Sequence, residues 1–368
     1  MRITCRKDHL AERLAIAGRA ASTRAGMQVA SGIRIGAPAA DAPLELAATD
    51  LELSLRVAAD AERVDEPGTV VVPARLVQEI VRALPGDTVT LADDGPARLR
   101  VSSGSGDYAL HAFAADDFPR LPELDPERVF GLDRRAVVAT VEQVARAASR
   151  DESRPVLTGV LVHFEAHALT MAATDSYRLA VREQPLERGS PEPLEAIVPA
   201  RALAEVARLS GSGDGTIDVT VQDNVVGFAI DGVSLTARRI DGQFPNFRSL
   251  LPDSHTHELA MPRQELLEIV RRVSIFARQN APVRLRFAQG ELTVSAQTPD
   301  VGQAEERLPV QYGEEPFEIG FNPDYLRDGI EAVEGDEVVL RLISPLRPAV
   351  LKGPGDDFWY LLMPIRLT

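Results

Sequence analysis

The 368-residue chain contains one cysteine, Cys5, and only two lysines, Lys7 and Lys352, among its 40 basic residues. A single cysteine excludes an internal disulfide and any zinc site built from several cysteines. No stretch approaches the roughly 18 consecutive apolar residues of a transmembrane helix. Charges are scattered through the N-terminal sequence, which therefore lacks the apolar segment of a signal peptide. We expect a soluble, cytoplasmic protein.

Signatures of catalysis and metal binding are also scarce. The six histidines and the single cysteine form no Ser/His/Asp or Cys/His set that stands out. His255 and His257 lack a third ligand nearby in the sequence, so they do not indicate a metal site. The glycine-rich runs at 102–107 and 210–215 contain neither the lysine of a P-loop nor a helix-opening GxGxxG. We expect neither enzymatic activity, nor a cofactor, nor a metal.

Internal repeats are the most informative feature that the chain does have. Three blocks recur in the same order: Leu44–Val57 as Leu169–Arg182, Thr69–Asp87 as Glu195–Asp214, and Ala114–Leu124 as Ile240–Pro252. Each block recurs at an offset of about 125 residues, which indicates a duplication.

A third and more diverged copy fills the rest of the chain. Glu291–Asp300 takes the place of the first block, Phe317–Asp336 that of the second, and Phe358–Leu367 that of the third. A chain of this length is expected to form two or three domains. The repeats predict three, at residues 1–125, 126–253 and 254–368.

Each copy predicts two helices and several antiparallel strands. Apolar residues at helical spacing predict a first helix at 8–21, 133–150 and 262–278. A second helix follows a proline-containing segment, at 74–84, 200–209 and 323–333. Asp133 is a plausible N-cap. Alternating segments such as 161–164 and 169–172 predict strands. The fold class is therefore α+β, used three times.

The formal net charge is −15, which argues at first against nucleic acid, because phosphate binding needs a basic surface. The six predicted helices, with the first extended to Arg24, nevertheless carry 16 basic and 11 acidic residues. The strands and loops therefore hold the acidic excess. Charged helix faces usually mean only solvent exposure. If all the helices line one surface, that surface is basic and suits a phosphate backbone without reading its sequence.

Six short motifs stand in order along the chain: RPVLTGVLV (154–162), ATDSYRLAV (173–181), IVPAR (197–201), DGQFPNFRSLLP (241–252), IGFNPDYL (319–326) and LMPIRL (362–367). Through these motifs the chain resembles the β sliding clamp of bacterial DNA polymerase III over essentially its whole length. Each motif alone is weak. Together, in order and in register with a triplication, they are specific.

The resemblance implies a processivity factor: a head-to-tail homodimeric ring of six domains, with helices lining the hole and antiparallel sheets outside. Its implied partners are double-stranded DNA, the DNA polymerase III alpha subunit, the clamp loader and other proteins with a clamp-binding motif. It also implies a hydrophobic peptide-binding pocket between the second and third domains. Carried over by motif, the pocket comprises Leu157, Thr174, Tyr177, Arg178, Leu179, Pro245, Leu250, Leu361, Met363, Pro364, Ile365 and Arg366.

Two further sets of residues follow from the resemblance and from the predicted helices. Alignment with the family sets Tyr108 of the first domain against Ile275 and Phe276 of the third domain of a partner, as the dimer interface. Arg24, Arg150, Arg201 and Arg278 lie at or near the ends of the predicted lining helices. Our hypothesis is that these four arginines contact DNA phosphates.

The sequence departs from well-known family members at Ser176-Tyr177, a position often held by Gly-His, and at Thr368, which extends the chain past the usual terminal leucine. A bulky Tyr177 would gate the groove. Two alternatives stay open: a specialised clamp paralogue, for example one that confers resistance to a clamp-targeting inhibitor, and an enzyme built on a triplicated α+β scaffold.

Overall fold

The computed structural model describes residues 1–22, 27–40, 42–95, 97–252, 254–277, 281–355 and 357–367. The chain forms two compact units, Met1–Gly131 with Thr216–Arg239, and Leu132–Gly215 with Ile240–Thr368. The predicted middle domain thus contributes to both units. Domain joins near 125 and 253 stay a prediction, and Asp253 lies outside the described residues. No helix in the described ranges is long and apolar enough to span a membrane.

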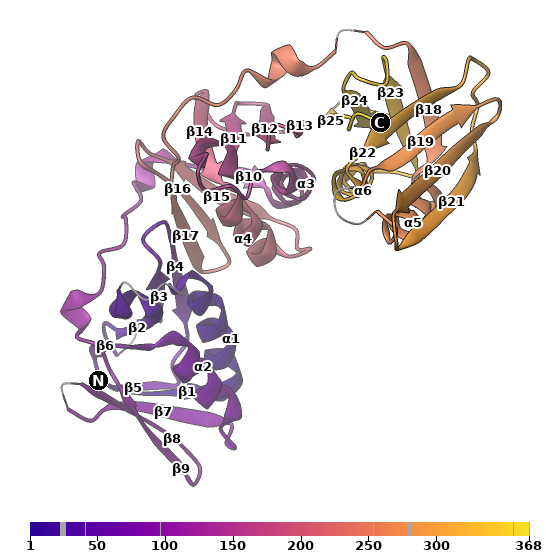
Figure 1. The fold of residues 1–368 in the computed structure, drawn as a ribbon. Helices are drawn as coiled ribbons and strands as arrows, with labels where there is room; N and C mark the ends of the chain where they lie inside the picture. Colours follow the sequence, from indigo (N-terminus) through magenta and orange to yellow (C-terminus); the bar gives the residue numbers. More distant parts are fainter. Residues whose placement is uncertain are drawn as a thin grey trace. The chain divides into compact units, whose positions relative to one another are not determined.

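The first unit contains two antiparallel sheets and two helices (Figure 1). The five-stranded sheet has the order β5 (Arg63–Glu66), β1 (Arg2–Arg6), β7 (Thr88–Asp93), β8 (Arg98–Ser103), β9 (Gly106–His111). The eight-stranded sheet has the order β10 (Val129–Asp133), β15 (Thr216–Val221), β16 (Val225–Ile230), β17 (Val233–Arg238), β4 (Leu53–Ala59), β3 (Leu44–Thr49), β2 (Gly32–Ala37), β6 (Gly68–Pro73). Helices α1 (Lys7–Ala17) and α2 (Ala74–Ala83) pack together, and α1 also packs on β3 and β4.

The second unit repeats this plan (Figure 1). Its eight-stranded sheet has the order β14 (Leu194–Pro199), β11 (Gly159–Phe164), β12 (Ala168–Thr174), β13 (Arg178–Pro185), β25 (Phe358–Leu362), β24 (Ala349–Lys352), β23 (Glu337–Leu342), β18 (His257–Pro262). Its four-stranded sheet has the order β21 (Gly302–Pro309), β20 (Glu291–Thr298), β19 (Val283–Ala288), β22 (Phe317–Phe321). Helix α3 (Arg134–Val144) packs on α4 (Ala200–Ser210), and α5 (Arg263–Ser274) packs on α6 (Pro323–Ala332).

Each eight-stranded sheet joins strands from two successive repeats. In the first unit β4 pairs with β17, with Leu55 opposite Leu235. In the second unit β13 pairs with β25, with Ala180 opposite Tyr360. These two junctions are equivalent, because each uses the strand after the same Thr-containing turn and the last strand of the next repeat.

All six predicted helices form, but the first helix of each copy is shorter than predicted. Helix α1 ends at Ala17 and continues as a single 3₁₀ turn, η1 (Gly18–Ala20); α3 ends at Val144 and continues as η5 (Ala145–Ala147). Terminal turns often tighten in this way, and apolar spacing does not mark the change. The N-cap predicted at Asp133 is confirmed, since its Oδ1 accepts a hydrogen bond from the backbone N–H of Ala136 at 2.8 Å.

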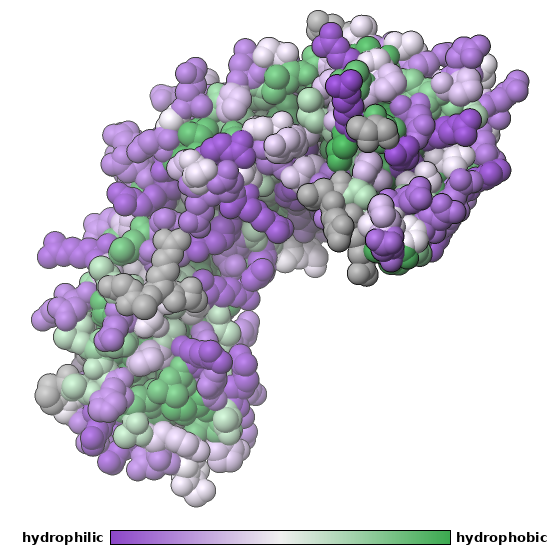
Figure 2. Space-filling view, in the orientation of Figure 1, coloured by the Kyte–Doolittle hydropathy of each residue, from purple (hydrophilic) through white to green (hydrophobic). Residues whose placement is uncertain are grey.

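Surface and interior are well separated. In the orientation of Figure 2, hydrophilic residues cover most of the visible surface, and hydrophobic residues appear there only in small patches. A few large apolar side chains are nevertheless exposed, including Tyr108, Tyr177, Leu250, Ile275 and Met363. All five were predicted from the sequence to contact a partner.

Candidate peptide-binding pocket and sheet edges

A tight turn between β12 and β13 supports the predicted pocket. The Thr174 hydroxyl donates to the carbonyl of Arg178 at 2.6 Å and accepts from the N–H of Ser176. Asp175 Oδ1 accepts from the N–H groups of Tyr177 and Arg178. Ser176 has a φ of 80°, in the left-handed region where non-glycine residues are uncommon. The buried Thr174 and Asp175 therefore build the turn, and Tyr177 projects from it.

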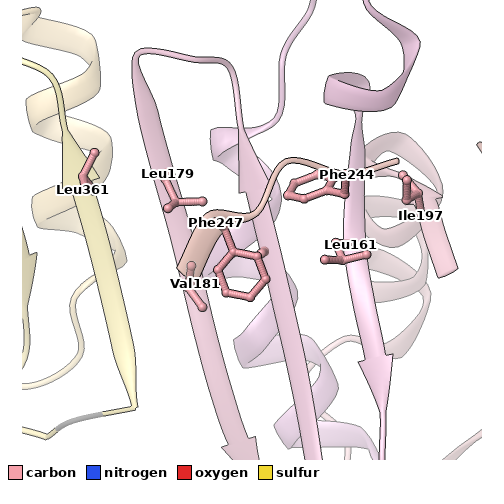
Figure 3. Packing of buried hydrophobic residues seen from close by; sticks show 8 residues of the cluster. Leu161, Leu179, Val181, Ile197, Phe244, Phe247 and Leu361 are labelled. Carbon is pink, nitrogen blue, oxygen red and sulfur yellow. The ribbon is translucent and has the colours of Figure 1, made fainter. Parts of the chain in front are cut away.

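A cluster of buried apolar side chains lies on one face of the second unit's eight-stranded sheet, where the predicted pocket would have its floor (Figure 3). We call it the apolar cluster; it comprises Leu161, Ala172, Leu179, Val181, Ile197, Phe244, Phe247 and Leu361. Leu179 of β13 lies directly opposite Leu361 of β25. Phe244 and Phe247 come from the segment after β17; Phe247 lies near Leu179 and Val181 of β13, and Phe244 lies nearer Leu161 and Ile197 (Figure 3).

Three exposed apolar residues of the predicted pocket belong to the segments that frame this cluster. Tyr177 is 61% exposed, Leu250 49% and Met363 40%. The N–H of Met363 donates to the carbonyl of Tyr177 at 2.9 Å, so the C-terminal segment is fixed beside the turn. Leu250 ends the 3₁₀ turn η7 (Phe247–Leu250) that carries Phe247. Apolar side chains around an apolar floor suit a peptide with hydrophobic anchors.

The remaining predicted pocket residues lie in the same unit. Leu157 is half-buried in η6 (Pro155–Thr158), and Pro245 is exposed between Phe244 and Phe247. The C-terminal Pro364 and Ile365 are half-buried, and Arg366 is exposed. The N–H of Ile365 donates to the carbonyl of Gly320 at the end of β22 at 2.8 Å, which fixes the C-terminal segment on the third repeat.

Arg178 differs from the other predicted pocket residues, because its side chain is used inside the protein. Successive strand residues point to opposite faces, so Arg178 points away from the apolar cluster that contains Leu179. Its guanidinium donates to Asp175, Asp328, the Tyr360 hydroxyl and the carbonyl of Arg146 at 2.6–3.2 Å. Burial alone would lower the pKa of Arg178, but contacts with Tyr360, Asp328 and Asp175 raise it above its usual range.

Arg178 therefore ties four elements together: the turn before β13, the end of the first helical segment of the second repeat, α6 and β25. Its guanidinium also lies over the ring of Tyr325 in α6, 4.3 Å from the ring centroid. A place in the pocket motif alone would suggest that Arg178 contacts a bound peptide. The geometry instead gives Arg178 a structural role, because its guanidinium already donates hydrogen bonds to partners within the protein.

Replacing Arg178 by methionine is expected to destabilise the protein by about 3–5 kcal/mol, because Asp175 and Asp328 lose their buried counter-ion. A matched control is Arg327→Met. Arg327 pairs with Asp324 on the surface of α6 at 3.0 Å, and such exposed pairs contribute about 0–1 kcal/mol. Urea unfolding of both variants measures the difference. Equal losses in the two variants would show that Arg178 does not fasten these elements.

Several residues of the site were not predicted from the sequence. Phe244 and Phe247 form part of the floor, and Tyr325 and Asp328 hold Arg178. The repeated Phe-Pro block could have indicated Phe244, because Phe118 is its counterpart in the first copy. Phe118 is also buried, in a smaller apolar cluster. The contacts of α6 with Arg178 span about 150 positions, and no local pattern marks them.

The equivalent junction in the first unit lacks the apolar anchors. Asp50 caps the same turn, and Leu51 has a φ of 77° where Ser176 has 80°. However, Ser54 and Thr236 face each other where Leu179 and Leu361 do in the second unit. The Ser54 hydroxyl bonds that of Thr49 at 2.8 Å. The turn is thus common to both junctions, whereas the apolar floor of the pocket is particular to the second.

Two sheets end in edge strands, one of which carries Tyr108 and the other of which begins beside Phe276. β9 ends the five-stranded sheet of the first unit, and β21 ends the four-stranded sheet of the second. Tyr108 lies on β9 and is 42% exposed. Ile275 follows α5 and is 61% exposed, while the half-buried Phe276 lies against Gly302, the first residue of β21. At least one of the adjacent residues Ile275 and Phe276 was predicted to be free for a partner, and Ile275 is.

Of the four predicted DNA-contacting arginines, Arg24 and Arg278 lie outside the described residues. Arg150 is exposed after η5, and Arg201 is exposed in the first turn of α4. Other helix arginines already have acidic partners. Arg146 and Arg271 share the carboxylate of Glu331 at 3.1 and 2.8 Å. Burial alone would raise the pKa of Glu331, but Arg271 and Arg146 hold it below its usual range.

The two histidines weighed as metal ligands have separate partners. His255 pairs with Glu258 at 3.1 Å, and His257 pairs with Glu314 at 2.9 Å. Within the described ranges, no group of three or more histidine, cysteine, aspartate or glutamate side chains is arranged to hold a metal ion.

Comparisons with known proteins agree with this geometry. Three family models match in order: the DNA polymerase III beta subunit N-terminal domain at residues 1–122, its central domain at 131–246, and its C-terminal domain at 248–366. The chain belongs to the DNA polymerase III beta subunit family. It therefore has the three-domain clamp fold predicted from the repeats, and it is an accessory factor rather than an enzyme.

Relatives match over the whole chain. The beta sliding clamp of Streptomyces coelicolor is 36% identical, and that of Synechococcus elongatus 32% identical; both alignments cover 100% of each protein. The crystal structure of the DNA polymerase sliding clamp from Bacillus subtilis is 26% identical, with a TM-score of 0.93 and full coverage of both chains. These relatives support a DNA sliding clamp.

Proposed function

We propose that two copies of this chain close head to tail into a ring around duplex DNA and tether polymerases to it through the apolar pocket. One observation supports the ring. The strand pairing that joins the first repeat to the second also joins the second repeat to the third. β4 pairs with β17, and β13 pairs with β25. The corresponding strand of the third repeat, β21, and the corresponding last strand of the first, β9, are both sheet edges. An exposed edge strand is a template for pairing with another chain.

The repeats also give a register for this proposed pairing. Leu55 lies six residues after Thr49 and Ala180 six after Thr174, and they pair with Leu235 and Tyr360. In the third repeat, Ala304 holds the same place, because it pairs with Ala296, four residues after Leu292, as Ala180 pairs with Ala173, four residues after Leu169. In the first repeat, Tyr108 holds the hairpin position of Leu235 and Tyr360. We infer that Tyr108 of one copy lies opposite Ala304 of the next, with Ile275 beside them.

The interaction with DNA is proposed to be weak and independent of sequence. Arginines at helix ends, Arg150 and Arg201 among them, would contact phosphates transiently; Arg146 and Arg271 already share the carboxylate of Glu331. A net charge of −15 allows little counterion release. Retention on DNA would then come from encirclement, and we infer that the protein acts in the cytoplasm, where the chromosome lies.

The pocket is proposed to bind short peptides of the polymerase alpha subunit, the clamp loader and other partner proteins. Support comes from the exposed Tyr177, Leu250 and Met363 around the buried apolar cluster. The flexible Met363 side chain suits several related peptides. Arg366 remains available to orient a peptide's polar groups, because it is exposed and, unlike Arg178, it lies on the C-terminal segment.

Met363→Ala is expected to weaken binding of a labelled polymerase alpha-subunit peptide by about 1–3 kcal/mol, as for an anchor in a desolvated groove. Folding should survive, because Met363 is 40% exposed. Leu179→Ala should weaken binding similarly, but Leu179 is 1% exposed, so it should also cost about 2–5 kcal/mol of stability. Fluorescence anisotropy measures the affinity.

Leu76→Ala is a matched control, because Leu76 is 43% exposed but lies on α2, away from the pocket. The same variants should be tested for processive synthesis with the cognate polymerase and clamp loader on primed circular DNA. We expect Met363→Ala to shorten the products and Leu76→Ala to leave them unchanged. If Met363→Ala binds the peptide as the unmodified protein does, the pocket lies elsewhere.

A further inference from the structure

A separate cavity lies on the same face of the second unit's eight-stranded sheet as the proposed peptide pocket. Its volume is about 170 Å³, and its lining includes Leu251, Ser254, His255, Arg341, Val350 and Trp359. Val350 of β24 pairs with Leu361 of β25 and with Arg341 of β23. Directly paired residues share a face of a sheet, so these side chains lie on the face of the apolar cluster. None of the six belongs to the predicted pocket.

The cavity adjoins the apolar cluster. Leu251 and Trp359 line the cavity and pack against that cluster. Leu251 directly follows the pocket residue Leu250, and Trp359 is two residues before Leu361 on the same face of β25. Two residues along a strand span about 7 Å. An extended peptide that occupies the pocket therefore reaches the cavity within about three residues.

The lining residues indicate which kinds of side chain the cavity could bind. Trp359, Val350 and Leu251 provide apolar walls, and a cavity of about 150 Å³ in another protein is known to hold benzene. At the polar side, Arg341 Nε donates to Glu258 at 2.6 Å, and His255 pairs with the same carboxylate at 3.1 Å. This hydrogen bond with Arg341 holds the pKa of Glu258 below its usual range. The guanidinium has further donors, so it can also bind a second carboxylate.

We propose that this cavity is a flanking subsite for partner peptides. It takes one aromatic or large aliphatic side chain, next to an acidic residue, from the segment that continues a pocket-bound peptide. The apolar side chain fills the space beside Trp359, and the acidic side chain meets Arg341 at the rim. The subsite rests on the proposed peptide-binding function, and it would extend the recognised sequence beyond the pocket itself.

The test compares three labelled peptides on the full-length protein by fluorescence anisotropy. The first is the shortest polymerase alpha-subunit peptide that binds the pocket. The second and third carry a Gly-Phe-Asp or a Gly-Ser-Gly extension, each made at either end. The Gly-Phe-Asp extension at one end should strengthen binding about fivefold to tenfold, since it buries an aromatic ring but must be ordered. The Gly-Ser-Gly extension should add less than about twofold.

Two variants test whether the increase in affinity comes from the cavity. Ser254→Trp fills the cavity from an exposed rim position and should remove the gain while the shortest peptide binds as before. Arg341→Gln should remove about half of the gain in binding free energy, so that the extension strengthens binding only about twofold to threefold. Its matched control is Arg284→Gln, because Arg284 forms a similar cross-strand pair with Glu318 at 3.5 Å, away from the cavity.

The outcomes separate the two proposals. If the shortest peptide fails to bind the unmodified protein, the peptide pocket itself is wrong. If it binds, but neither Gly-Phe-Asp extension improves on Gly-Ser-Gly, the flanking subsite is overturned. A gain that persists in both Ser254→Trp and Arg341→Gln would also overturn it, because the extension would then be bound elsewhere.

Discussion

A protein that carries aspartate at both Ile275 and Phe276 is expected to be monomeric at low micromolar concentration, whereas the unmodified protein should have twice the chain mass of 39.8 kDa. In the proposed ring both side chains are covered by the partner's edge strand β9. Burying two unpaired carboxylates there costs several kcal/mol each, and a ring of two copies suffers the penalty at both interfaces. Sedimentation or native mass spectrometry measures the mass.

The single variant Ile275→Asp separates an interface effect from a folding effect. Ile275 is 61% exposed in the chain, whereas Phe276 contacts Gly302 and is half-buried. Leu346→Asp is the control, because Leu346 is 64% exposed in the loop between β23 and β24. We expect Ile275→Asp to weaken the dimer and Leu346→Asp to leave it intact. A fully dimeric double variant would contradict the assignment of this interface.

Disulfide formation tests the register of the same interface. Cysteines at Tyr108 and Ala304 should cross-link two copies on mild oxidation, whereas cysteines at Tyr108 and Gln303 should cross-link poorly, since adjacent strand residues point to opposite faces. The native Cys5 should not interfere, because it is fully buried and burial raises the pKa of its thiol to about 12. Equal yields from the two pairs would contradict the register.

The repeats and helices were predictable because their signals are local or periodic. The blocks around Asp50 and Asp175 differ in almost every exposed residue, yet both aspartates cap the same turn. Helix ends were less predictable, since the change from α-helix to a 3₁₀ turn after Ala17 leaves the apolar spacing intact. The pairing of β13 with β25 was not predicted, because it joins strands of two repeats that lie far apart in the sequence.

The peptide site stays a prediction, but the structure shows what one of its polar residues contacts within the protein. A motif places Arg178 in the pocket, but it does not show which face of β13 the side chain occupies. The structure turns it toward Asp328 and Tyr360, on elements about 150 or more positions away. The helix charge count likewise overstated the available cations, because Arg146 and Arg271 share Glu331. Such long-range pairs leave no local pattern in the sequence.

The largest expected effect concerns retention on DNA. A closed ring cannot leave a circle without opening, so its retention should not depend on phosphate contacts. At about 1 M salt the Debye length is about 3 Å, and ordinary electrostatic binding with several phosphate contacts would be lost. The loaded protein should nevertheless remain bound to a nicked circle through such a wash.

Charge reversal of Arg24, Arg150, Arg201 and Arg278 separates loading from retention. These substitutions should reduce loading by the clamp loader, because the phosphate contacts that guide DNA into the ring are removed. Dimer formation and peptide binding should hardly change, since neither Arg150 nor Arg201 lies on an edge strand or in the apolar cluster. Unchanged loading in the fourfold variant would show that the phosphate contacts lie elsewhere.

Linearisation of the loaded circle tests encirclement most directly. The protein is loaded by its clamp loader onto a nicked circular plasmid, washed at high salt and then treated with a restriction enzyme that cuts the plasmid once. We expect the bound protein to be retained on the uncut circle and released within minutes after the cut, because the ring slides off an end. Equal retention on circular and linear DNA would contradict the ring.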